Sequence, residues 1–545
     1  MFFVKNTDMN FNESINIVIA GEAGQGIESA SEIISGILHF NNYNVFSIPE
    51  YMSRIRGGCN SSLIKVSSEK SPCFSSRIDV LFALDNKAFE HLKDRISDKT
   101  ISLDLKKKNF YIIGYVVALF KLNPDDCLKF IKNRFEALFE EKNINDFKEG
   151  FEEGIKNVDI EIKIPANKNT DEKMFLPVND ALGIGCIGGG CNFVPFYPMS
   201  PATFLQLFLT KHADEFSIVS KQVEDEICVI NMAIGAWYAG ARAIACTSGG
   251  GFDLMCEGVS LAGITESPIV INIAQRPGPA TGLPTRTEQG DLNIALYGGH
   301  GSFPRIIYSP ATIEDAFKIG QKAFDIADKF QVPVFVLTDQ ALLESAYSSK
   351  ELIFETLPIN HFEQSNPDYK RYELSENPVS SRAIPNLGEG LVCVDSDEHD
   401  EHGWIIEDSA TRETMVKKRS AKLDQIKNNI FPPYFVGAED YKVLIVSWGS
   451  NFNVINEVIK HKKDFAPKKF GFLHFTQIYP LDKSITSYTQ KAEKLIIIEQ
   501  NATGDFAKLL KSEFGINFDK HLFKYNGMPF SVEEINDFLE KINEI

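Results

Sequence analysis

Short apolar stretches alternate with longer amphipathic ones in the first third of the chain. Residues 15–20 are apolar and rich in β-branched side chains, which is typical of a buried strand. A glycine-containing segment, 21–26, follows, and apolar residues at helical spacing then continue to about residue 40. The apolar run 80–84 predicts another buried strand. This alternation predicts a parallel α/β domain over residues 12–165.

The same alternation recurs in two later regions. A second α/β domain is predicted over 176–345 and a third over 439–545. The predicted strands are 243–246, 269–273 and 332–337 in the second domain and 443–447, 469–474 and 495–498 in the third, and the predicted helices of the second domain include 226–239 and 313–330. The fold class is therefore α/β, with three α/β domains.

Two polar segments separate these regions. Residues 166–175 lack periodicity and are predicted to be a linker. Residues 346–438 are rich in Pro, Asn, Ser and charge, with one helical stretch at 410–428. A connection of this length usually wraps a neighbouring element or joins domains.

Composition narrows the class of protein. The chain has 545 residues, 43% of them apolar and 24% charged, as expected of a folded globular protein. Its net charge of −18 argues against a nucleic-acid partner or an anionic membrane surface. The longest apolar run, 110–120, falls short of the roughly twenty residues of a membrane helix, so no membrane association is predicted. Residues 1–15 contain no long apolar run, so no signal peptide is expected.

The nine cysteines carry no C-x-x-C pair and none of the close spacings that bind iron–sulfur clusters. We therefore expect no cluster in this chain. An odd number of scattered cysteines fits reduced thiols, and the expected location is the cytoplasm.

The glycine segment after the first strand is a candidate phosphate site. Its G-x-x-G-x-G spacing, with Gly24 and Gly26 before a helix, places backbone N–H groups where a phosphate could bind. Arg54 and Arg56 stand beside two glycines and are candidate anion ligands. The alternatives are a tight strand-to-helix connection and a solvated basic loop.

Glu226 differs from the acidic residues just before it. Glu224 and Asp225 precede the predicted helix, where carboxylates interact favourably with the helix dipole. Glu226 starts the buried stretch, and the apolar face is predicted to run on through Ile227, Ile230, Ala233 and Ile234 to Gly235. Burial would raise the pKa of the Glu226 carboxyl, which could then share a proton with a ligand nitrogen.

Three further segments lie in or next to this region. Ser200 stands between two prolines that stiffen the backbone around its hydroxyl, although a helix N-cap would also explain it. Thr247 follows the strand 243–246, at the end of the sheet where ligands bind in α/β folds. Residues 275–291 hold three prolines, three glycines and two arginines, Arg276 and Arg286. This loop is a candidate anion-binding loop with fixed geometry.

On these segments the chain resembles the 2-oxoacid:ferredoxin oxidoreductases, in the form of an α subunit with a γ domain fused at its N-terminus. Tyr197–Pro201 is similar to the family's YPxTP motif, with Ser200 in place of threonine, and Glu226 followed by Gly235 matches the E-x8-G spacing of thiamine-diphosphate pyrimidine domains. Segments 247–251, 282–291 and 499–504 also resemble the family. The resemblance implies a γ-type domain, a thiamine-diphosphate-binding pyrimidine domain and a transketolase C-terminal-like domain.

The resemblance also implies a reaction, the CoA-dependent oxidative decarboxylation of a 2-oxoacid with electrons passed to ferredoxin. Glu226 would bond N1′ of thiamine diphosphate, and Ser200 and Arg286 would hold the substrate. Substrate neighbours would be Thr247, Arg276 and Tyr197, while Gly24, Gly26, Arg54 and Arg56 would contact CoA. The fused chain is most similar to members that convert 2-oxoglutarate to succinyl-CoA. Pyruvate or a broad range of 2-oxoacids is the alternative.

One motif of thiamine enzymes is missing. They bind the diphosphate through Mg²⁺ with a Gly-Asp-Gly motif, which does not occur in the chain; Gly290-Asp291-Leu292 comes closest. The family resemblance assigns the diphosphate, Mg²⁺ and a [4Fe-4S] cluster to a separate β subunit. The implied assembly is an αβ heterodimer or its dimer, and no metal ligand is predicted in this chain.

Two other classes of function stay open at this point. A dinucleotide-dependent oxidoreductase would use the glycine segment 21–26, but no clear acidic ribose ligand follows a second strand. A scaffold subunit would keep the fold and lack the chemistry.

Overall fold

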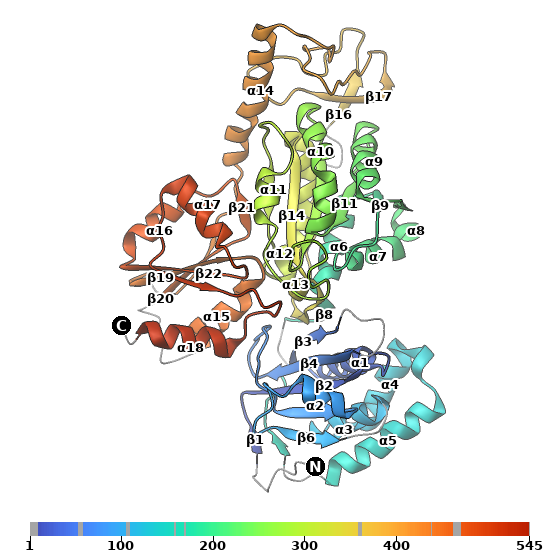
Figure 1. The fold of residues 1–545 in the computed structure, drawn as a ribbon. Helices are drawn as coiled ribbons and strands as arrows, with labels where there is room; N and C mark the ends of the chain where they lie inside the picture. Colours follow the sequence, from blue (N-terminus) through green and yellow to red (C-terminus); the bar gives the residue numbers. More distant parts are fainter. Residues whose placement is uncertain are drawn as a thin grey trace. The chain divides into compact units, whose positions relative to one another are not determined.

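The computed structural model describes residues 9–52, 58–104, 109–156, 160–167, 171–357, 362–437, 439–461 and 470–543. The chain is built of strands and helices that form two compact units (Figure 1). Unit 1 comprises Met1–Pro177, Glu344–Glu351 and Phe530–Ile545, and unit 2 comprises Val178–Leu343 and Leu352–Pro529. The final helix, predicted with the third domain, is thus grouped with the N-terminal region. The division into three domains stays a prediction.

Unit 1 combines a large mixed sheet with helices. Its strands are β1 (Met9–Phe11), β2 (Ser14–Glu22), β3 (Asn44–Glu50), β4 (Cys59–Ser67), β5 (Val80–Ala83), β6 (Ile101–Asp104), β7 (Ile160–Ile162), β8 (Met174–Pro177) and β15 (Ala346–Ser349). Its helices are α1 (Ile27–Phe40), α2 (Asn86–His91), α3 (Asn109–Leu119), α4 (Pro124–Arg134), the short 3₁₀ helix η1 (Glu136–Leu138), α5 (Glu141–Lys156) and α18 (Val532–Asn543).

The prediction of a parallel sheet in the first domain is wrong. The strand order is β6-β5-β2-β4-β3-β15-β8, and in this sheet only the β6–β5 and β5–β2 pairs are parallel. β4 pairs antiparallel with both β2 and β3. The reason is chain length: eight residues, 51–58, separate β3 from β4, whereas a parallel crossover needs about a dozen or more.

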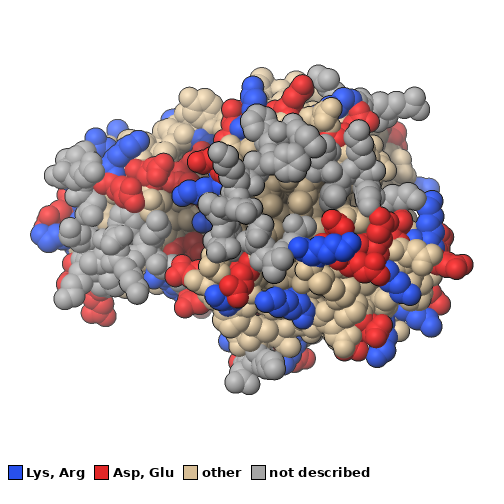
Figure 2. All heavy atoms as spheres, turned by 90° about the horizontal axis from the view of Figure 1, so that it is seen from below, with Lys and Arg blue, Asp and Glu red and all other residues tan. Residues whose placement is uncertain are grey.

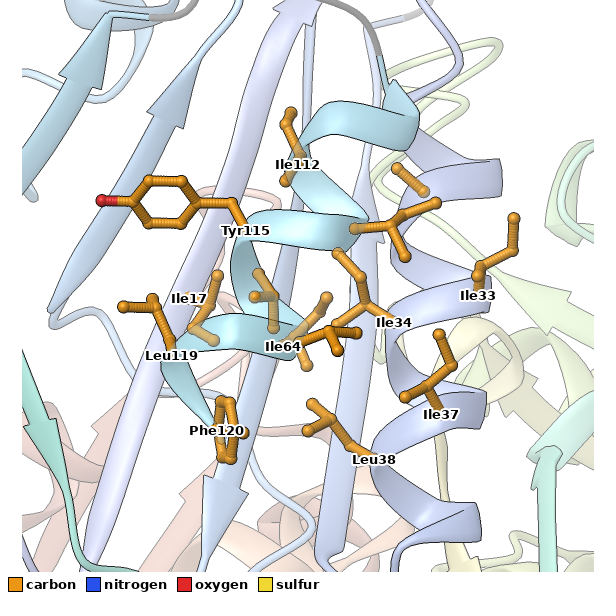
Figure 3. Packing of buried hydrophobic residues seen from close by; sticks show 14 of the residues in the cluster. Ile17, Ile33, Ile34, Ile37, Leu38, Ile64, Ile112, Tyr115, Leu119 and Phe120 are labelled. Carbon is orange, nitrogen blue, oxygen red and sulfur yellow. The ribbon is translucent and has the colours of Figure 1, made fainter. Parts of the chain in front are cut away.

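The core of unit 1 forms where α1 and α3 cover the sheet. Figure 3 shows isoleucines of α1 and apolar side chains of α3 pointing toward Ile17 of β2 and Ile64 of β4. The run 110–120, too short for a membrane helix, is this buried helix α3. Among the residues that the structure describes, no helix is both long and apolar enough to cross a bilayer.

Unit 2 contains a parallel sheet, a second, smaller sheet and a long connecting segment. Its strands are β9 (Phe193–Phe196), β10 (Val219–Gln222), β11 (Ile244–Thr247), β12 (Ile269–Gln275), β13 (Ile306–Tyr308), β14 (Pro333–Asp339), β16 (Phe362–Ser365), β17 (Arg382–Gly388), β18 (Tyr434–Gly437), β19 (Val443–Trp448), β20 (Phe470–Phe475), β21 (Gln477–Tyr479), β22 (Lys494–Glu499) and β23 (Lys520–Phe523). Its helices are α6 (Val178–Gly188), α7 (Thr203–Lys211), α8 (Ala213–Phe216), α9 (Glu226–Tyr238), α10 (Gly249–Ile264), α11 (Leu292–Tyr297), α12 (Ile313–Phe330), α13 (Gln340–Glu344, its last residue in unit 1), α14 (Ser409–Lys427), the 3₁₀ helix η2 (Gly449–Asn451), α15 (Phe452–His461), α16 (Ile485–Lys491) and α17 (Asp505–Phe514).

The larger sheet of unit 2 has the order β10-β9-β11-β12-β14-β13-β21 and is parallel except for β21. The helix predicted at 313–330 is confirmed as α12, and the strand predicted at 332–337 is confirmed as β14. Helices α9 and α10 pack against each other beside β11 (Figure 1). The carboxyl ends of β11 and β12 therefore face the loops in which the candidate residues lie.

The smaller sheet has the order β18-β20-β19-β22-β23 and is parallel except for β18. Three strands predicted in the third domain, at 443–447, 469–474 and 495–498, are confirmed as β19, β20 and β22, although residue 469 lies outside the described residues.

The connecting segment is attached to the region just after α10 through buried ion pairs. Lys418 of α14 donates to both carboxylate oxygens of Glu266, at 2.8 and 2.9 Å, and Lys422 also pairs with Glu266. Burial alone would raise the pKa of Glu266, but the two lysines bring that pKa below its ordinary value. Because an unpaired buried charge is costly, these pairs fix the segment in one arrangement.

On the face drawn in Figure 2, the described acidic and basic side chains are interspersed among other residues rather than gathered by sign.

All nine cysteines are free thiols.

Candidate active site

Glu226 is the first residue of α9, and Asp225 caps that helix by accepting a hydrogen bond from the backbone N–H of Cys228 at 3.0 Å. The predicted apolar face is confirmed at Ile230, Ala233 and Ile234, which are buried, and is wrong at Ile227, which is 46% exposed, and at Gly235, which is also exposed. The buried residues of α9 are Glu226, Val229, Ile230, Ala233, Ile234 and Trp237. This spacing follows the helical period, which places the carboxyl group of Glu226 on the buried face.

The carboxyl group of Glu226 lies at the carboxyl end of β11. Glu226 is 2% exposed, and its Oε1 accepts a hydrogen bond from the hydroxyl of Thr247 at 3.5 Å. Burial raises the pKa of Glu226, while the Thr247 hydroxyl and the nearby charge of Arg276 oppose that rise. A buried carboxyl with a raised pKa and one weak side-chain partner is suited to sharing a proton with a ligand nitrogen.

Gly251 in the first turn of α10 leaves room for this carboxyl. A Cβ at this position would lie 2.2 Å from Thr247 Oγ1 and 2.3 Å from Glu226 Oε1. Glycine is therefore needed here for close approach rather than for a special backbone conformation.

We expect Gly251→Ala to lower the free energy of unfolding by about 1–3 kcal/mol, since the added methyl group overpacks the site. Activity of the assembled enzyme should fall at least about tenfold, because the Glu226 carboxyl must move. The matched control is Gly250→Ala, where a Cβ would meet only Ala280 O at 3.6 Å and stability should not fall. Thermal unfolding and turnover measure both, and a Gly251→Ala variant as stable and active as the parent would contradict this arrangement.

Four contacts bring the 197–201 segment to the same place. The side-chain amide of Gln206 donates to the carbonyls of Tyr197 at 3.2 Å and Cys246 at 2.8 Å. Thr247 Oγ1 lies 3.8 Å from the sulfur of Met199, and Arg276 Nη1 donates to the carbonyl of Ser200 at 2.6 Å. The structure thus gathers these segments beside Glu226.

Two of these side chains remain accessible. Tyr197 is 37% exposed and Ser200 is exposed. The N-cap of α7 is Ala202, so Ser200 does not cap that helix. The alternative explanation of Ser200, a helix N-cap, is therefore wrong.

Asp291 is a buried carboxyl that the sequence did not single out as a site residue. Burial raises the pKa of Asp291 to about 7, with Asp253 and Glu288 adding to the rise and Arg276 and the Gly249 N–H opposing it. Its Oδ2 has no hydrogen-bond partner in the described part of the chain. A carboxyl group in a Pro- and Gly-rich loop carries no sequence signal for burial, so only the packing of the loop reveals it.

Arg286 lies in the same loop but is held by other elements. Its Nη1 donates to the sulfur of Met528 at 3.4 Å, and the N–H of Thr287 donates to the carbonyl of Gly527 at 3.1 Å. Arg286 is half-buried. Gly527 and Met528, which follow the last strand of the smaller sheet, thus support Arg286, the residue predicted from the sequence to bind the substrate.

The glycine segment in unit 1 forms a tight entry to α1. Gly26 is the N-cap of α1 with φ 73°, and no side chain caps the helix. A Cβ on Gly26 would lie 2.0 Å from the side-chain nitrogen of Asn109, whereas one on Gly24, at φ 89°, would meet nothing within 4 Å. Close packing accounts for Gly26, and Gly24 faces open space. Arg54 and Arg56 lie outside the described residues.

Two serines that follow those arginines in the sequence lie in a strand. Ser61 and Ser62 are buried in β4, and the hydroxyl of Ser62 donates to that of Ser31 at 2.7 Å. Their place in a paired strand comes from the short connection that makes β4 antiparallel.

Within the described residues, no group of three or more His, Cys, Asp or Glu side chains is arranged to hold a metal ion.

Comparison with known proteins defines the class. A family model described as pyruvate flavodoxin/ferredoxin oxidoreductase, thiamine diphosphate-binding, matches residues 184–418. A second, described as pyruvate ferredoxin/flavodoxin oxidoreductase, matches residues 16–107. The chain is thus an oxidoreductase subunit with a thiamine-diphosphate-binding domain, and Glu226 and Thr247 lie within that domain's match.

Individual relatives narrow the class. A 2-oxoacid:ferredoxin oxidoreductase subunit alpha of Sulfolobus sp is 29% identical, with 96% of each chain covered. The 2-oxoglutarate synthase subunit KorA of Archaeoglobus fulgidus is 33% identical, covering 61% of this chain and 89% of that one. A solved 2-oxoglutarate:ferredoxin oxidoreductase from Magnetococcus marinus, with 2-oxoglutarate, coenzyme A and succinyl-CoA bound, superimposes with a TM-score of 0.90 at 26% identity, covering 97% of this chain and 99% of that one. The chain belongs to the 2-oxoacid:ferredoxin oxidoreductase family, as an α subunit.

This membership confirms the family resemblance, the α/β fold class and the oxidoreductase activity predicted from the sequence. It also decides against a dinucleotide-dependent enzyme, whose predicted site was the glycine segment of unit 1.

Proposed function

We propose that the chain, assembled with a partner subunit, converts 2-oxoglutarate and CoA to succinyl-CoA and CO₂ and passes the electron pair to ferredoxin. The observation that carries this proposal is the similarity over 97% of the chain to an oxidoreductase whose structure holds 2-oxoglutarate, coenzyme A and succinyl-CoA. The chain's own geometry adds a buried carboxyl group, Glu226, in the domain that the family model describes as binding thiamine diphosphate.

Glu226 fits the aminopyrimidine half of that cofactor. The carboxyl is buried, its raised pKa favours a shared proton, and Gly251 keeps the space beside it free of a side chain. In this proposal Glu226 holds a proton on its carboxylate oxygen toward the ring nitrogen N1′ and orients the ring. Thiamine diphosphate, when bound, stabilises the carbanion left by loss of CO₂.

The substrate would bind beside Glu226 through hydroxyl and guanidinium donors. Ser200 offers an exposed hydroxyl, and Arg286 offers a guanidinium on a loop held at several points. Arg276 adds a second positive charge next to Ser200. 2-Oxoglutarate carries two carboxylates, so two guanidinium groups match it better than they match pyruvate. Thr247 and Tyr197 are proposed as neighbours that shape the pocket.

The partner subunit completes the site in this proposal. It supplies the Mg²⁺ ion and the residues that bind the diphosphate, together with a [4Fe-4S] cluster that passes electrons to ferredoxin. Support comes from the absence of a Gly-Asp-Gly motif in this sequence and from relatives named as alpha subunits. The proposed assembly is an αβ heterodimer or its dimer.

CoA is the proposed co-substrate, with the glycine segment of unit 1 and the arginines at 54 and 56 as its phosphate ligands. Support comes from the open space beside Gly24 and from the glycine N-cap of α1, where no side chain caps the helix. We also place the enzyme in the cytoplasm, where the nine free thiols would stay reduced.

The substrate assignment predicts a preference that rates can measure. With the assembled enzyme, we expect kcat/KM for 2-oxoglutarate to exceed that for pyruvate, because pyruvate leaves one guanidinium without a carboxylate partner. Reduction of a viologen dye with each acid and CoA gives both constants. A preference for pyruvate of about tenfold, or ~1.4 kcal/mol in the barrier, would overturn the assignment in favour of the pyruvate alternative, and near-equal values would favour a broad-range enzyme.

A further inference from the structure

Gln289 is fully buried in the loop between β12 and α11. Within the described part of the chain, its hydrogen-bond partners all lie in the region of the smaller sheet. Its side-chain amide donates to the carbonyl of Trp448 at 2.9 Å. Its side-chain oxygen accepts from Asn451 Nδ2 and from the backbone N–H of Gln500, both at 2.9 Å. Its backbone N–H donates to the carbonyl of Gln500 at 2.6 Å, and its carbonyl accepts from Asn501 Nδ2 at 3.2 Å. One residue thus makes five hydrogen bonds to a separate part of unit 2.

The partners of Gln289 lie at or just after the ends of two neighbouring strands. We call these partners, Trp448, Asn451, Gln500 and Asn501, the platform. Trp448 ends β19 and Glu499 ends β22, and the two strands are neighbours in the smaller sheet. The buried carboxylate of Glu499 accepts from the backbone N–H groups of Phe506 at 2.8 Å and Ala507 at 2.9 Å, at the start of α17, and from Asn501 Nδ2 at 3.0 Å. The Glu499–Gly504 segment contains Gln500 and Asn501, two of the four residues that bond Gln289.

The same platform supports Arg286, three residues before Gln289. The side chain of Gln500 donates to the carbonyl of Met528 at 2.9 Å, and Met528 contacts the guanidinium of Arg286. A Cβ on Gly527 would lie 3.0 Å from the Cβ of Arg286. Thr287, between them, donates its backbone N–H to Gly527 and its hydroxyl to Asp339 Oδ1 at 3.0 Å. Gln500 is thus linked to Arg286 in two ways: through Met528, which contacts the guanidinium, and through Gln289, which lies in the same loop as Arg286.

We propose that Gln289 is a positioning residue for the substrate: it bonds the 276–291 loop to the ends of β19 and β22 and thereby holds Arg286 where it binds the 2-oxoacid. The proposal rests on the role of Arg286 under the proposed function. The loop has sixteen residues and no helix or strand of its own, so ordering it costs conformational entropy that fixed contacts must offset. Gln289 provides such contacts, and a buried amide that loses its partners is costly. The smaller sheet therefore affects substrate binding indirectly, by holding the loop that carries Arg286.

The test is Gln289→Met in the assembled enzyme, a change that keeps the side-chain length and removes its three hydrogen bonds. We expect KM for the 2-oxoacid to rise at least about tenfold while KM for CoA stays within about twofold. The control is Gln321→Met. Gln321 is also buried and its side chain makes two bonds to the backbone of Glu355, at 2.6 and 3.1 Å, in the connecting segment. Gln321→Met should lower stability to a similar degree and leave KM for the 2-oxoacid unchanged.

Asn451→Leu serves as a milder second variant in case Gln289→Met does not fold. It removes one of the two bonds to the Gln289 side-chain oxygen from the platform side, and KM for the 2-oxoacid should rise about threefold or more. If Gln321→Met raises this KM as much as Gln289→Met, or if Gln289→Met and Asn451→Leu both leave it unchanged, the proposal is overturned.

A double-mutant cycle shows whether Gln289 acts through Arg286. Arg286→Met alone should raise KM for the 2-oxoacid, and adding Gln289→Met should then change it less than about twofold. Fully additive effects would overturn the positioning role. If Arg286→Met leaves KM unchanged, the substrate role of Arg286 fails, whatever Gln289→Met does, so the two failures are distinguishable.

Discussion

Glu226→Gln should lower kcat of the assembled enzyme by a factor on the order of 100 or more, the effect of removing an acid/base group. Glutamine keeps the size of the side chain and its hydrogen-bonding oxygen but cannot hold the shared proton. The site makes this residue sensitive: Glu226 is buried, bonds the Thr247 hydroxyl and has a pKa raised by burial. Turnover with saturating 2-oxoacid and CoA measures the loss.

The matched control is Glu224→Gln, two residues earlier. Glu224 is exposed and precedes the N-cap of α9, where its carboxylate interacts with the helix dipole and with the Cys228 thiol, away from the Glu226 carboxyl. Its replacement should change kcat less than about twofold. If Glu226→Gln retained nearly full activity, the chain would be a scaffold subunit and the proposed proton-holding role would be wrong.

The second large effect concerns the chain without its partner. We expect the purified 545-residue chain to show no turnover above the blank with 2-oxoacid, CoA, thiamine diphosphate and Mg²⁺. The physical reason is that a diphosphate needs a metal ion and ligands that neutralise its charge, and the sequence lacks the Gly-Asp-Gly motif that provides them. The pyrimidine half of the site alone gives only part of the binding energy.

Two measurements keep this prediction informative. Circular dichroism must show that the isolated chain is folded, so that inactivity is not unfolding. Thiamine diphosphate with Mg²⁺ should leave its unfolding temperature unchanged, whereas adding the partner subunit should restore both turnover and stabilisation by the cofactor. Turnover by the isolated chain would refute the assignment of the diphosphate half to a partner.

Much of the architecture follows from local pattern. The amphipathic period of α12 and the apolar runs of β2, β12 and β22 predict those elements closely, because neighbouring residues alone decide them. β4 was missed, since the polar start of Cys59–Ser67 does not read as a buried strand. Its polar groups are satisfied by pairing on both edges, which depends on strands distant in sequence.

The candidate site shows the same limit. Glu226 stands out from the sequence because an acidic residue opens an apolar helix. The pattern also predicted the buried position of Ile230, but it placed Ile227 on that face in place of Val229. Asp291 and Gln289 lie in a loop whose composition signals rigidity but not partners. The hydrogen-bond partners of Gln289 lie more than a hundred residues away in the sequence, so no local pattern predicts its burial.

By itself, the sequence determined the α/β class, the positions of most helices and strands, and the segments that mark the family, because periodicity and short motifs depend on residues close together in the chain. Only the tertiary structure decided that β4 runs antiparallel, that the carboxyl of Glu226 meets Thr247 and Gly251, and that Gln289 joins the substrate loop to the smaller sheet. The physical reason is that a buried polar group must find its partner wherever packing brings one, and packing joins segments whose separation along the chain carries no signal.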